Sequence, residues 1–288
     1  MAKILKADSV NHVFEDVIQD LSYKLEKRPR LVVLIGDRCK STEPDYVYLN
    51  QIQKRAKKYG VDLVALERSV LSSNLTLFRT AETAEKEENL DGAITLSDFS
   101  SLDRSPWSYY YDLDHNGTSI AYDILNSSPV DYQRFSCTAN AVYQLLRHND
   151  IPLTGKKIGV VGRSAKVGLP TALLLMQANA TVTVYHSLSD LSGLKSEDIV
   201  ISAVGKPKFL TADLFREGQT VVDVGLNTDP STDRVCGDVD FDNVKKALGD
   251  EGAITPVPGG IGPLTNTILF SRLFSNAWKK QKERSGCL

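Results

Sequence analysis

The chain has 288 residues, and its 34 Lys and Arg against 36 Asp and Glu give a formal net charge of −2 at pH 7. That balance excludes a polybasic protein that clamps nucleic acid through its phosphates. With 42% hydrophobic and 24% charged residues, the composition is that of an ordinary globular protein and excludes disordered, collagen-like and coiled-coil chains. At roughly 100–200 residues per domain, the length predicts two domains.

The cysteines and the apolar runs exclude several further classes. Cys39, Cys137, Cys236 and Cys287 lie far apart, form no C-x-x-C pair and have no histidine at ligand spacing. We therefore expect neither a metal site nor a disulfide framework. Charges interrupt the first eight residues, and no stretch of about 18 apolar residues occurs. We expect a cytoplasmic protein that has no nucleic-acid or membrane partner.

The first half of the chain alternates predicted helices and strands. Apolar residues recur every three or four positions over 9–25, which predicts an amphipathic helix. Further elements follow from apolar periodicity and from breakers such as Gly60: strands at 30–35, 61–66 and 92–96, and helices at 45–59, 74–86 and 138–148. Residues 97–135 are the least regular stretch and contain an aromatic cluster from Trp107 to Tyr111.

The second half contains a strand–turn–helix–strand pattern over residues 157–185, which predicts a βαβ unit. Three more strands are expected at 199–203, 220–224 and 253–254. The alternation of strand and helix predicts parallel sheets and an α/β fold class with two α/β domains, the second a Rossmann-type doubly wound parallel sheet. We place the domain boundary near the helix at 138–148.

The turn from Gly162 to Pro170 has the place of a phosphate-binding turn, after a strand and before a helix. It does not match G-x-G-x-x-G, so a turn in a nucleotide-free sheet is the alternative. The next strand ends in His186-Ser187 rather than in Asp or Glu, which usually bind the ribose of NAD. Because Arg163 and Ser187 could bond a 2′-phosphate, the charge pattern favours NADP over NAD. An exposed turn arginine is the other interpretation of Arg163.

A second segment rich in glycine and proline runs from Thr255 to Thr265 and holds three residues of each kind. Such a segment restricts φ at the prolines and lets a ligand approach the backbone at the glycines. A stiff structural connector would explain the same composition.

Five motifs together resemble those of the bifunctional methylenetetrahydrofolate dehydrogenase/methenyltetrahydrofolate cyclohydrolase family. They are G-R-S-x-x-V-G-x-P, A-V-G-K-P, D-V-G-[IL]-N, G-D-V and P-V-P-G-G-[VI]-G-P-[ML]-T, and they stand in the family's order at 162–170, 203–207, 223–227, 237–239 and 256–265. The resemblance is close over residues 150–275 and looser before them.

The resemblance implies a folate or catalytic domain at 1–138 plus 266–288, an NADP-binding Rossmann domain at 139–265, and an active-site cleft between them. It implies a homodimer, NADP as cofactor and 5,10-methylenetetrahydrofolate as substrate. The cofactor-binding residues that it implies are Gly162, Arg163, Ser164, Val167, Ser187, Val204, Gly205 and Leu226. The substrate-binding residues are Tyr46, Pro258, Gly259, Gly260 and Thr265, and the catalytic ones are Tyr48 and Asp114.

The sequence departs from the family's pattern in the first domain. Relatives carry Y-V-x-x-K on a helix, with the lysine as the central proton-handling group. If Tyr46 matches the tyrosine, the lysine position is Asn50; if Tyr48 matches, it is Ile52. Lys54 lies about 200° around the helix from Ile52 and is a poor substitute. The glutamine that orients the lysine in relatives corresponds here to Leu96.

These losses bear unequally on the two reactions of the family. Hydride transfer needs mainly positioning, whereas opening the methenyl ring calls for general acid–base help worth roughly 10² to 10⁴ in rate. We therefore expect an NADP-dependent methylenetetrahydrofolate dehydrogenase whose cyclohydrolase activity is weak or absent. Two alternatives remain open: an NADP-dependent oxidoreductase with another small substrate, and a non-catalytic NADP-binding protein.

Overall fold

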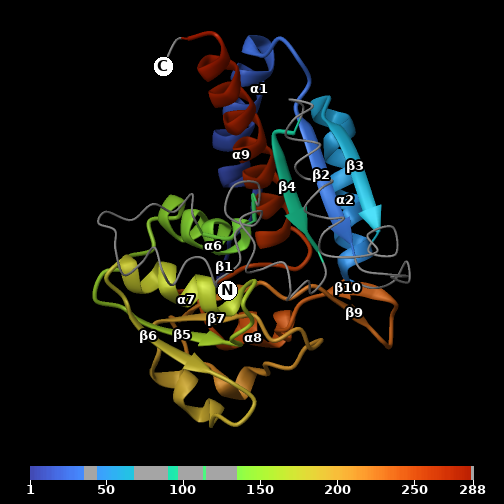
Figure 1. Ribbon diagram of the computed structural model, residues 1–288. Coiled ribbons are helices and arrows are strands. Elements are labelled where there is room, and N and C mark those ends of the chain that lie inside the picture. Colours follow the sequence, from blue (N-terminus) through green and yellow to red (C-terminus); the bar gives the residue numbers. More distant parts are fainter. Residues whose placement is uncertain (36–43, 68–89, 97–112, 115–134, 287–288) are drawn as a thin grey trace. The chain divides into compact units, whose positions relative to one another are not determined.

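The computed structural model describes residues 1–35, 44–67, 90–96, 113–114 and 135–286 (Figure 1). The chain divides into two compact units. The first comprises Met1–His12 and Asn116–Thr265, and the second comprises Val13–His115 and Asn266–Leu288. The predicted helix at 74–86, the aromatic cluster at 107–111, Cys39 and Cys287 lie outside the described residues.

The first unit is built on a parallel sheet of six strands in the order β1-β11-β8-β7-β5-β6. The strands are β1 (Lys3–Ile4), β5 (Lys157–Val161), β6 (Thr181–Tyr185), β7 (Ile199–Ser202), β8 (Thr220–Asp223) and β11 (Ala253–Ile254). Next to the edge strand β6, Val160 of β5 is paired with Val184 of β6 and with Ile201 of β7. The Rossmann-type parallel sheet that the sequence predicts is confirmed.

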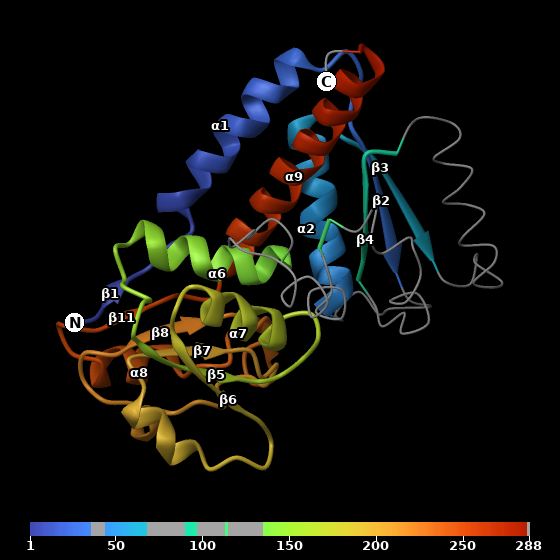
Figure 2. The ribbon, with the colours of Figure 1, turned by 60° about the vertical axis from the view of Figure 1, so that its left-hand side comes forward.

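Helices cover both faces of this sheet, which explains why its central strands are nearly continuous apolar runs. In Figure 2, α6 (Cys137–His148) and α7 (Gly168–Gln177) lie on one side of the strands and α8 (Phe241–Ala247) on the other. Two short 3₁₀ segments, η3 (Leu191–Ser196) and η4 (Ala212–Leu214), complete the connections. The right-handed crossovers that parallel strands require place these connections on opposite faces.

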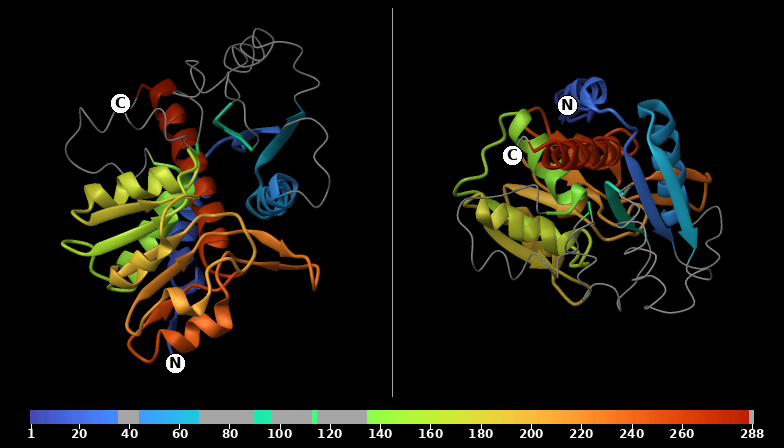
Figure 3. Two further views of the ribbon diagram at one scale, coloured as in Figure 1. Left: turned by 90° about the horizontal axis from the view of Figure 1, so that it is seen from below. Right: turned by 45° about the horizontal axis from the view of Figure 1, so that its top comes forward.

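Two features of the first unit were not predicted from the sequence. The short strand β1 adds to the edge of the sheet, where the Lys3 amide donates to the Gly252 carbonyl (2.8 Å) and the Leu5 amide to the Ile254 carbonyl (2.8 Å). An antiparallel hairpin of β9 (Asn227–Asp229) and β10 (Arg234–Cys236), orange in Figure 3, extends away from the sheet. Strands of two or three residues are too short to show a period in sequence.

The second unit contains a parallel sheet of three strands in the order β3-β2-β4, formed by β2 (Arg30–Ile35), β3 (Asp62–Glu67) and β4 (Gly92–Thr95). Three helices accompany it: α1 (Asp8–Lys24), α2 (Pro44–Tyr59) and α9 (Ile261–Arg284). The helices predicted at 9–25 and 45–59 and the three predicted strands agree with the structure to within one residue, and the helix predicted at 74–86 stays a prediction.

Helices α2 and α9 pack side by side on the same side of this sheet (Figure 2). The Arg55 guanidinium donates to the Thr267 hydroxyl at 2.7 Å, and the rings of Tyr59 and Phe270 lie 5.3 Å apart. None of the described helices is long and apolar enough to cross a membrane.

Candidate functional site

The order of the six strands defines where a ligand would bind in the first unit. Along the chain, β5 is followed by β6 on one side of it and then by β7 on its other side. Connections therefore diverge between β5 and β7, and in open parallel sheets ligands bind outside the carboxyl ends of the strands at such a point. Gly162 and Ala203 are the residues that follow β5 and β7 there.

Gly162 begins the turn after β5 in a backbone conformation that side chains rarely adopt, with φ at +111°. Its amide donates to the Tyr185 carbonyl at 2.9 Å, and a Cβ at this position would overlap the carbonyl oxygen of Ala203. Arg163 comes next and is exposed, and it makes no ion pair with any residue in the part of the chain that the structure describes. A turn that has no side chain at Gly162, next to an exposed arginine without an ion-pair partner among the described residues, suits an anionic ligand.

Ser164 organises the beginning of α7. Its hydroxyl accepts hydrogen bonds from the amides of Val167 (3.3 Å) and Gly168 (3.4 Å). A Cβ at Gly168 would overlap the carbonyl oxygen of Gly162, so the glycine permits the close contact between helix and strand. The N-terminus of α7 thus lies directly after the β5 turn, and the helix dipole there favours negative charge.

The end of β6 carries no free carboxylate at the position where NAD enzymes usually have one. His186 and Ser187 follow the strand, and Ser187 is exposed. The first acidic residue after them, Asp190, accepts hydrogen bonds from the amide and hydroxyl of Ser192 (2.9 and 2.6 Å), which lower its pKa. Its carboxylate is therefore engaged in capping η3, and it keeps its charge there.

Tyr185 is the last residue of β6, and its buried side chain holds this end of the strand in place. Its hydroxyl donates to Oε1 of the buried Glu197 at 2.8 Å. Burial, together with the neighbouring Glu197 carboxylate, raises the pKa of Tyr185 to about 12. The phenol is therefore neutral at physiological pH and acts as a hydrogen-bond donor that fixes the strand from which Ser187 follows.

The ends of β7 and β8 contribute the remaining predicted cofactor residues. Val204 and Leu226 are half-buried, and Gly205 is exposed with φ at +71°. These two turns are joined by two buried carboxylates, Asp223 and Asp238. Sequence reasoning did not single out either aspartate as a site residue, although each stands inside one of the five motifs and a charged residue in a mostly apolar run is a usable signal.

Burial is the main cause that raises the pKa of Asp223 to about 7, and the charge of Asp238 adds to it. Backbone amides of Val239, Asp238 and Gly225 oppose this rise because they donate to the ionised carboxylate. Asp223 thus changes its protonation close to physiological pH.

The segment from Thr255 to Thr265 connects β11 to α9. Pro258 is exposed, Gly259 has φ at +107°, and the Gly259 carbonyl accepts the Ala7 amide at 3.0 Å. Gly260 is buried. Thr265 is also buried, and its hydroxyl donates to the Ile261 carbonyl at 3.1 Å inside α9. The Thr265 hydroxyl is thus used within the helix, whereas Pro258 and Gly259 stay accessible.

In the second unit, Tyr46 and Tyr48 lie on α2 and Asp114 follows the buried Leu113, and all three predicted residues are half-buried. The two candidate lysine positions differ sharply: Asn50 is exposed, whereas Ile52 is 0% exposed. Hence Ile52 belongs to the buried face of α2.

The position of the expected glutamine is also occupied by hydrocarbon, since Leu96 is 6% exposed at the end of β4. Lys54 is exposed, as its helical angle from Ile52 predicts. Neither buried position can donate or accept a proton.

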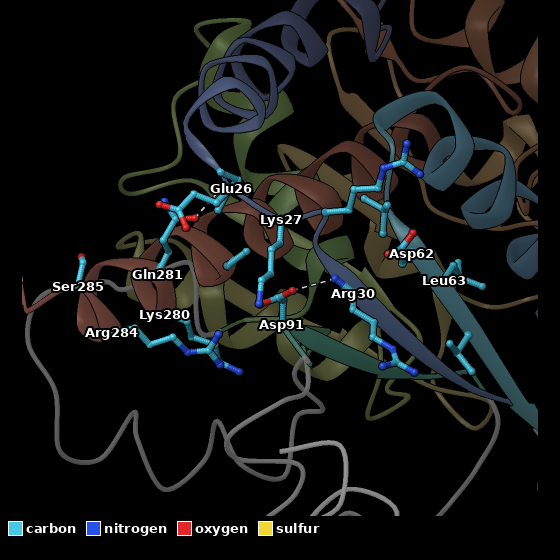
Figure 4. Close-up of a pocket in the computed structure, with 15 residues that line it drawn as sticks. Glu26, Lys27, Arg30, Asp62, Leu63, Asp91, Lys280, Gln281, Arg284 and Ser285 are labelled. Carbon is cyan, nitrogen blue, oxygen red and sulfur yellow. Dashed lines mark hydrogen bonds between the residues drawn. The ribbon is translucent and has the colours of Figure 1, made fainter. Parts of the chain in front are cut away.

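Figure 4 shows a cavity of about 1010 Å³ in the second unit. It lies where β2 and β3 begin and where α9 ends, beside residues such as Arg30, Asp62 and Arg284. Asp91 projects into it, accepts the Arg30 amide at 2.8 Å, and has its pKa raised by burial. None of the predicted site residues is among the described residues that line this cavity, which opens at the amino ends of the strands rather than at their carboxyl ends.

The structure brings the eight predicted cofactor residues together at the carboxyl ends of four neighbouring strands of the first unit. The predicted substrate and catalytic residues are divided: Pro258, Gly259, Gly260 and Thr265 belong to the first unit, and the remaining three to the second. Over the described residues, no group of three or more His, Cys, Asp or Glu side chains could hold a metal ion.

Comparison with protein families matches residues 136–282 to the family described as tetrahydrofolate dehydrogenase/cyclohydrolase, NAD(P)-binding domain. Among curated proteins, the bifunctional protein FolD of Staphylococcus haemolyticus is 34% identical over 99% of both chains. The FolD protein of Caldicellulosiruptor saccharolyticus is 46% identical over 153 residues, and that match spans 51% of this chain and 54% of the relative.

Two solved structures are similar to this chain over almost its whole length. The bifunctional methylenetetrahydrofolate dehydrogenase/cyclohydrolase FolD of Campylobacter jejuni superimposes with a TM-score of 0.79 at 26% identity, covering 97% of this chain and 99% of that one. The Trypanosoma brucei enzyme, whose structure contains NADP and an inhibitor, gives a TM-score of 0.78 at 25% identity over 98% and 99% of the two chains.

Proposed function

Because the chain belongs to the tetrahydrofolate dehydrogenase/cyclohydrolase family, we propose that it oxidises 5,10-methylenetetrahydrofolate to 5,10-methenyltetrahydrofolate with NADP⁺. The observation that carries this proposal is the cluster of polar and glycine-containing turns at the carboxyl ends of β5, β6, β7 and β8. The NADP present in the Trypanosoma brucei structure supports the same cofactor here.

The residues of the first unit fit a phosphorylated dinucleotide. When bound, NADP⁺ supplies the acceptor for a hydride. The backbone of the turn that follows Gly162 and the dipole at the N-terminus of α7 suit its pyrophosphate, and Ser164 holds that turn in shape. The exposed Arg163 and Ser187 bind the 2′-phosphate, and His186 and Ser187 directly after β6 place no carboxylate next to it.

We assign the remaining predicted residues to the folate. Tyr46, Pro258, Gly259, Gly260 and Thr265 bind the substrate, and Tyr48 and Asp114 contact its reacting part. In this arrangement residues 139–265 form the NADP domain, and residues 1–138 with 266–288 form the folate domain. We also propose that the protein is a cytoplasmic homodimer.

Cyclohydrolase activity is weak or absent in this proposal. The hydrolysis adds water to the methenyl carbon and opens a ring, which needs a group that moves a proton. The buried Ile52 and Leu96 cannot do so, and Asn50, the other candidate position, has no basic group. Hydride transfer from the methylene carbon depends mainly on positioning, so its rate falls less than the rate of hydrolysis when these groups are missing.

The test mixes purified protein with 5,10-methylenetetrahydrofolate and NADP⁺ and follows NADPH and methenyl product by absorbance, with NAD⁺ in a parallel reaction. We expect NADPH formation, accumulation of the methenyl product and a slower reaction with NAD⁺. Rapid loss of the methenyl product would contradict the weak cyclohydrolase. Absence of NADPH from a protein that binds NADP⁺ would favour another small substrate, or a non-catalytic NADP-binding protein if no folate shifts its melting temperature.

A further inference from the structure

Two buried carboxylates lie directly beneath the turns that follow β7 and β8. Asp223 is the last residue of β8 and is 3% exposed, and Asp238, between β10 and α8, is 0% exposed. Buried aspartates are costly unless their oxygens accept enough hydrogen bonds. The groups that donate hydrogen bonds to these carboxylates therefore show which backbone segments the carboxylates hold in place.

Among the described residues Asp238 accepts four hydrogen bonds, and all four come from the end of β7, the turn after it and the start of β9. Its Oδ2 accepts from the Ser202 hydroxyl (3.0 Å) and the Val204 amide (2.7 Å). Its Oδ1 accepts from the Lys206 amide (3.0 Å) and the Asn227 side-chain amide (2.8 Å). The carboxylate thus fixes the backbone on both sides of Gly205 and ties it to the segment that follows β8.

Asp223 holds Asp238 in turn. Its Oδ1 accepts the amides of Gly225 (2.9 Å) and Asp238 (3.1 Å), and its Oδ2 accepts the Val239 amide (2.9 Å). The backbone that carries Asp238 is therefore bound to the end of β8, which fixes the direction in which the Asp238 side chain leaves it.

Two glycines make room for this arrangement. A Cβ at Gly225 would overlap Oδ1 of Asp238, and a Cβ at Gly237 would overlap Oδ2 of Asp223. The close approach of backbone and carboxylate at both places is possible only without side chains. The motifs D-V-G-L-N and G-D-V are explained by this contact, since each supplies one aspartate and one of the two glycines.

The turn that Asp238 fixes is open to a ligand. Gly205 and Lys206 are exposed, and the turn adjoins Gly162 through the close contact of that glycine with the Ala203 carbonyl. A buried anion that accepts amides from inside the turn leaves the outer surface of the turn rigid and free of side-chain bulk at Gly205. Rigid binding groups lose less entropy when the ligand arrives.

We propose that Asp238 is a positioning residue of the dinucleotide site, whose carboxylate shapes the 203–206 turn and Asn227 before NADP binds. It acts through the backbone of the turn and does not touch the cofactor. This assignment rests on the proposed NADP function, because it names NADP as the ligand of the turn.

The test compares the wild type with Asp238→Asn. The asparagine has nearly the same shape but replaces one acceptor oxygen by an NH₂ group, which cannot accept from two of the four donors. We expect the Kd for NADP⁺, measured by calorimetry, to rise about tenfold or more because hydrogen bonds to a charged group are lost. The KM for NADP⁺ should rise by a similar factor while kcat changes little.

A second readout needs no cofactor. In the nucleotide-free protein, hydrogen–deuterium exchange of the peptide that contains Val204 and Lys206 should accelerate in the variant, whereas exchange in β5 should not. Asp213→Asn is the matched control, because Asp213 is an exposed aspartate of the same unit that accepts from Thr211. We expect wild-type values of Kd and exchange for this control.

Ser202→Ala keeps the proposal testable if Asp238→Asn does not fold, since it removes a single donor and leaves a small side chain in a buried place. A rise in Kd of a few-fold with faster exchange of the Val204 amide is expected. Unchanged Kd and unchanged exchange in either variant would overturn the positioning role, and so would uniformly faster exchange across the unit. A wild-type protein that binds no NADP⁺ would overturn the proposed function together with this inference.

Discussion

In the first unit buried carboxylates accept hydrogen bonds at the ends of strands, whereas in the second unit the buried face of α2 is hydrocarbon. Asp223, Asp238 and Glu197 each accept donors at or next to the turns of the candidate nucleotide site. At the positions where the resemblance expects lysine and glutamine, Ile52 and Leu96 are buried instead. The buried carboxylates of the first unit fix the shape of a binding surface. The buried Ile52 and Leu96 of the second unit maintain the packing of the fold, but they cannot transfer a proton.

This difference separates two properties of an enzyme that can change independently. Binding and orienting a cofactor depend on backbone turns whose shape comes from internal hydrogen bonds. Acid–base catalysis depends on single side chains, which one substitution can delete without disturbing the sheet that carries them. In the function that we propose, the first unit supplies what the binding step needs, whereas positions 52 and 96 of the second unit lack the polar groups that the hydrolytic step requires.

The largest expected effect comes from restoring the missing polar pair. In the double variant Ile52→Lys with Leu96→Gln, we expect methenyltetrahydrofolate hydrolysis to rise by roughly 10² to 10⁴. The stability should fall at the same time, because a charged group would enter a buried position. The measurement is the decay of methenyl absorbance, and Asn50→Lys, at an exposed position of the same helix, is the control.

A folded double variant that hydrolyses no faster than the wild type would contradict the idea that the residues at positions 52 and 96 limit hydrolysis. It would mean that more than two side chains separate this second unit from a hydrolytic one, or that the folate does not lie against α2. A gain in Asn50→Lys alone would instead assign the lysine position to residue 50.

The next largest effect concerns the pH dependence of stability in the first unit. Because burial raises the pKa of Asp223 to about 7, the folded chain keeps this proton up to neutral pH, whereas the unfolded chain releases it near its ordinary value of 3.8. The free energy of unfolding should therefore fall as pH rises from about 4 to about 7, by about 1.4 kcal/mol for each unit of pKa difference.

Urea unfolding at several pH values checks this prediction, with Asp223→Asn as the comparison. The Asp238 carboxylate and the Cys236 thiol both lie close enough to influence Asp223, and both remain in that variant. The difference between the two chains thus isolates the contribution of Asp223. Parallel pH profiles would show that the three amides that donate to Asp223 keep it ionised.

The preference for NADP⁺ over NAD⁺ tests the role of the first unit in cofactor binding. Replacing Arg163 with alanine should weaken NADP⁺ about 10- to 100-fold through the loss of charge-assisted hydrogen bonds, and should weaken NAD⁺ less. Fluorescence titration with NADPH and NADH measures both affinities, and Lys246→Ala, an exposed cation on α8, is the control. Equal losses for the two nucleotides would move Arg163 away from the 2′-phosphate.

Much of this architecture could be predicted because its elements are long enough to show a period. The strand at Arg30–Ile35 was predicted with its observed bounds, and the βαβ unit predicted over 157–185 begins and ends with the observed β5 and β6, since these strands are β-branched or apolar runs between clear breakers. Strand β1 and the hairpin of β9 and β10 could not be found, because pairing with distant residues rather than local pattern defines them.

The candidate site divides in the same way. Gly162 and Ser164 could be proposed from a strand–turn–helix pattern, which is local in sequence. The roles of Asp223 and Asp238 could not, because their donors lie up to 36 residues away along the chain and only the fold brings them together. Nor could sequence decide whether residue 50 or residue 52 faces the interior, which required the packing of α2.

The smallest expected effect concerns the charges that the second unit does possess. Lys58 on α2 donates to Glu15 on α1 at 2.8 Å, with the two side chains 59% and 39% exposed, and the contact raises the pKa of Lys58 and lowers that of Glu15. Water and salt screen such a pair, so Lys58→Met should cost at most about 1 kcal/mol in the free energy of unfolding. The Tyr59 hydroxyl still donates to Glu15 after the change.

Urea unfolding at low salt and in about 1 M NaCl, where the Debye length falls to about 3 Å, measures this cost. We expect the difference between wild type and Lys58→Met to vanish at high salt, whereas a loss of stability in Asp238→Asn should persist because the Asp238 side chain is 0% exposed. A large, salt-resistant loss in Lys58→Met would mean that the second unit also depends on desolvated charge. The contrast between the units would then lie in the groups at positions 52 and 96 alone.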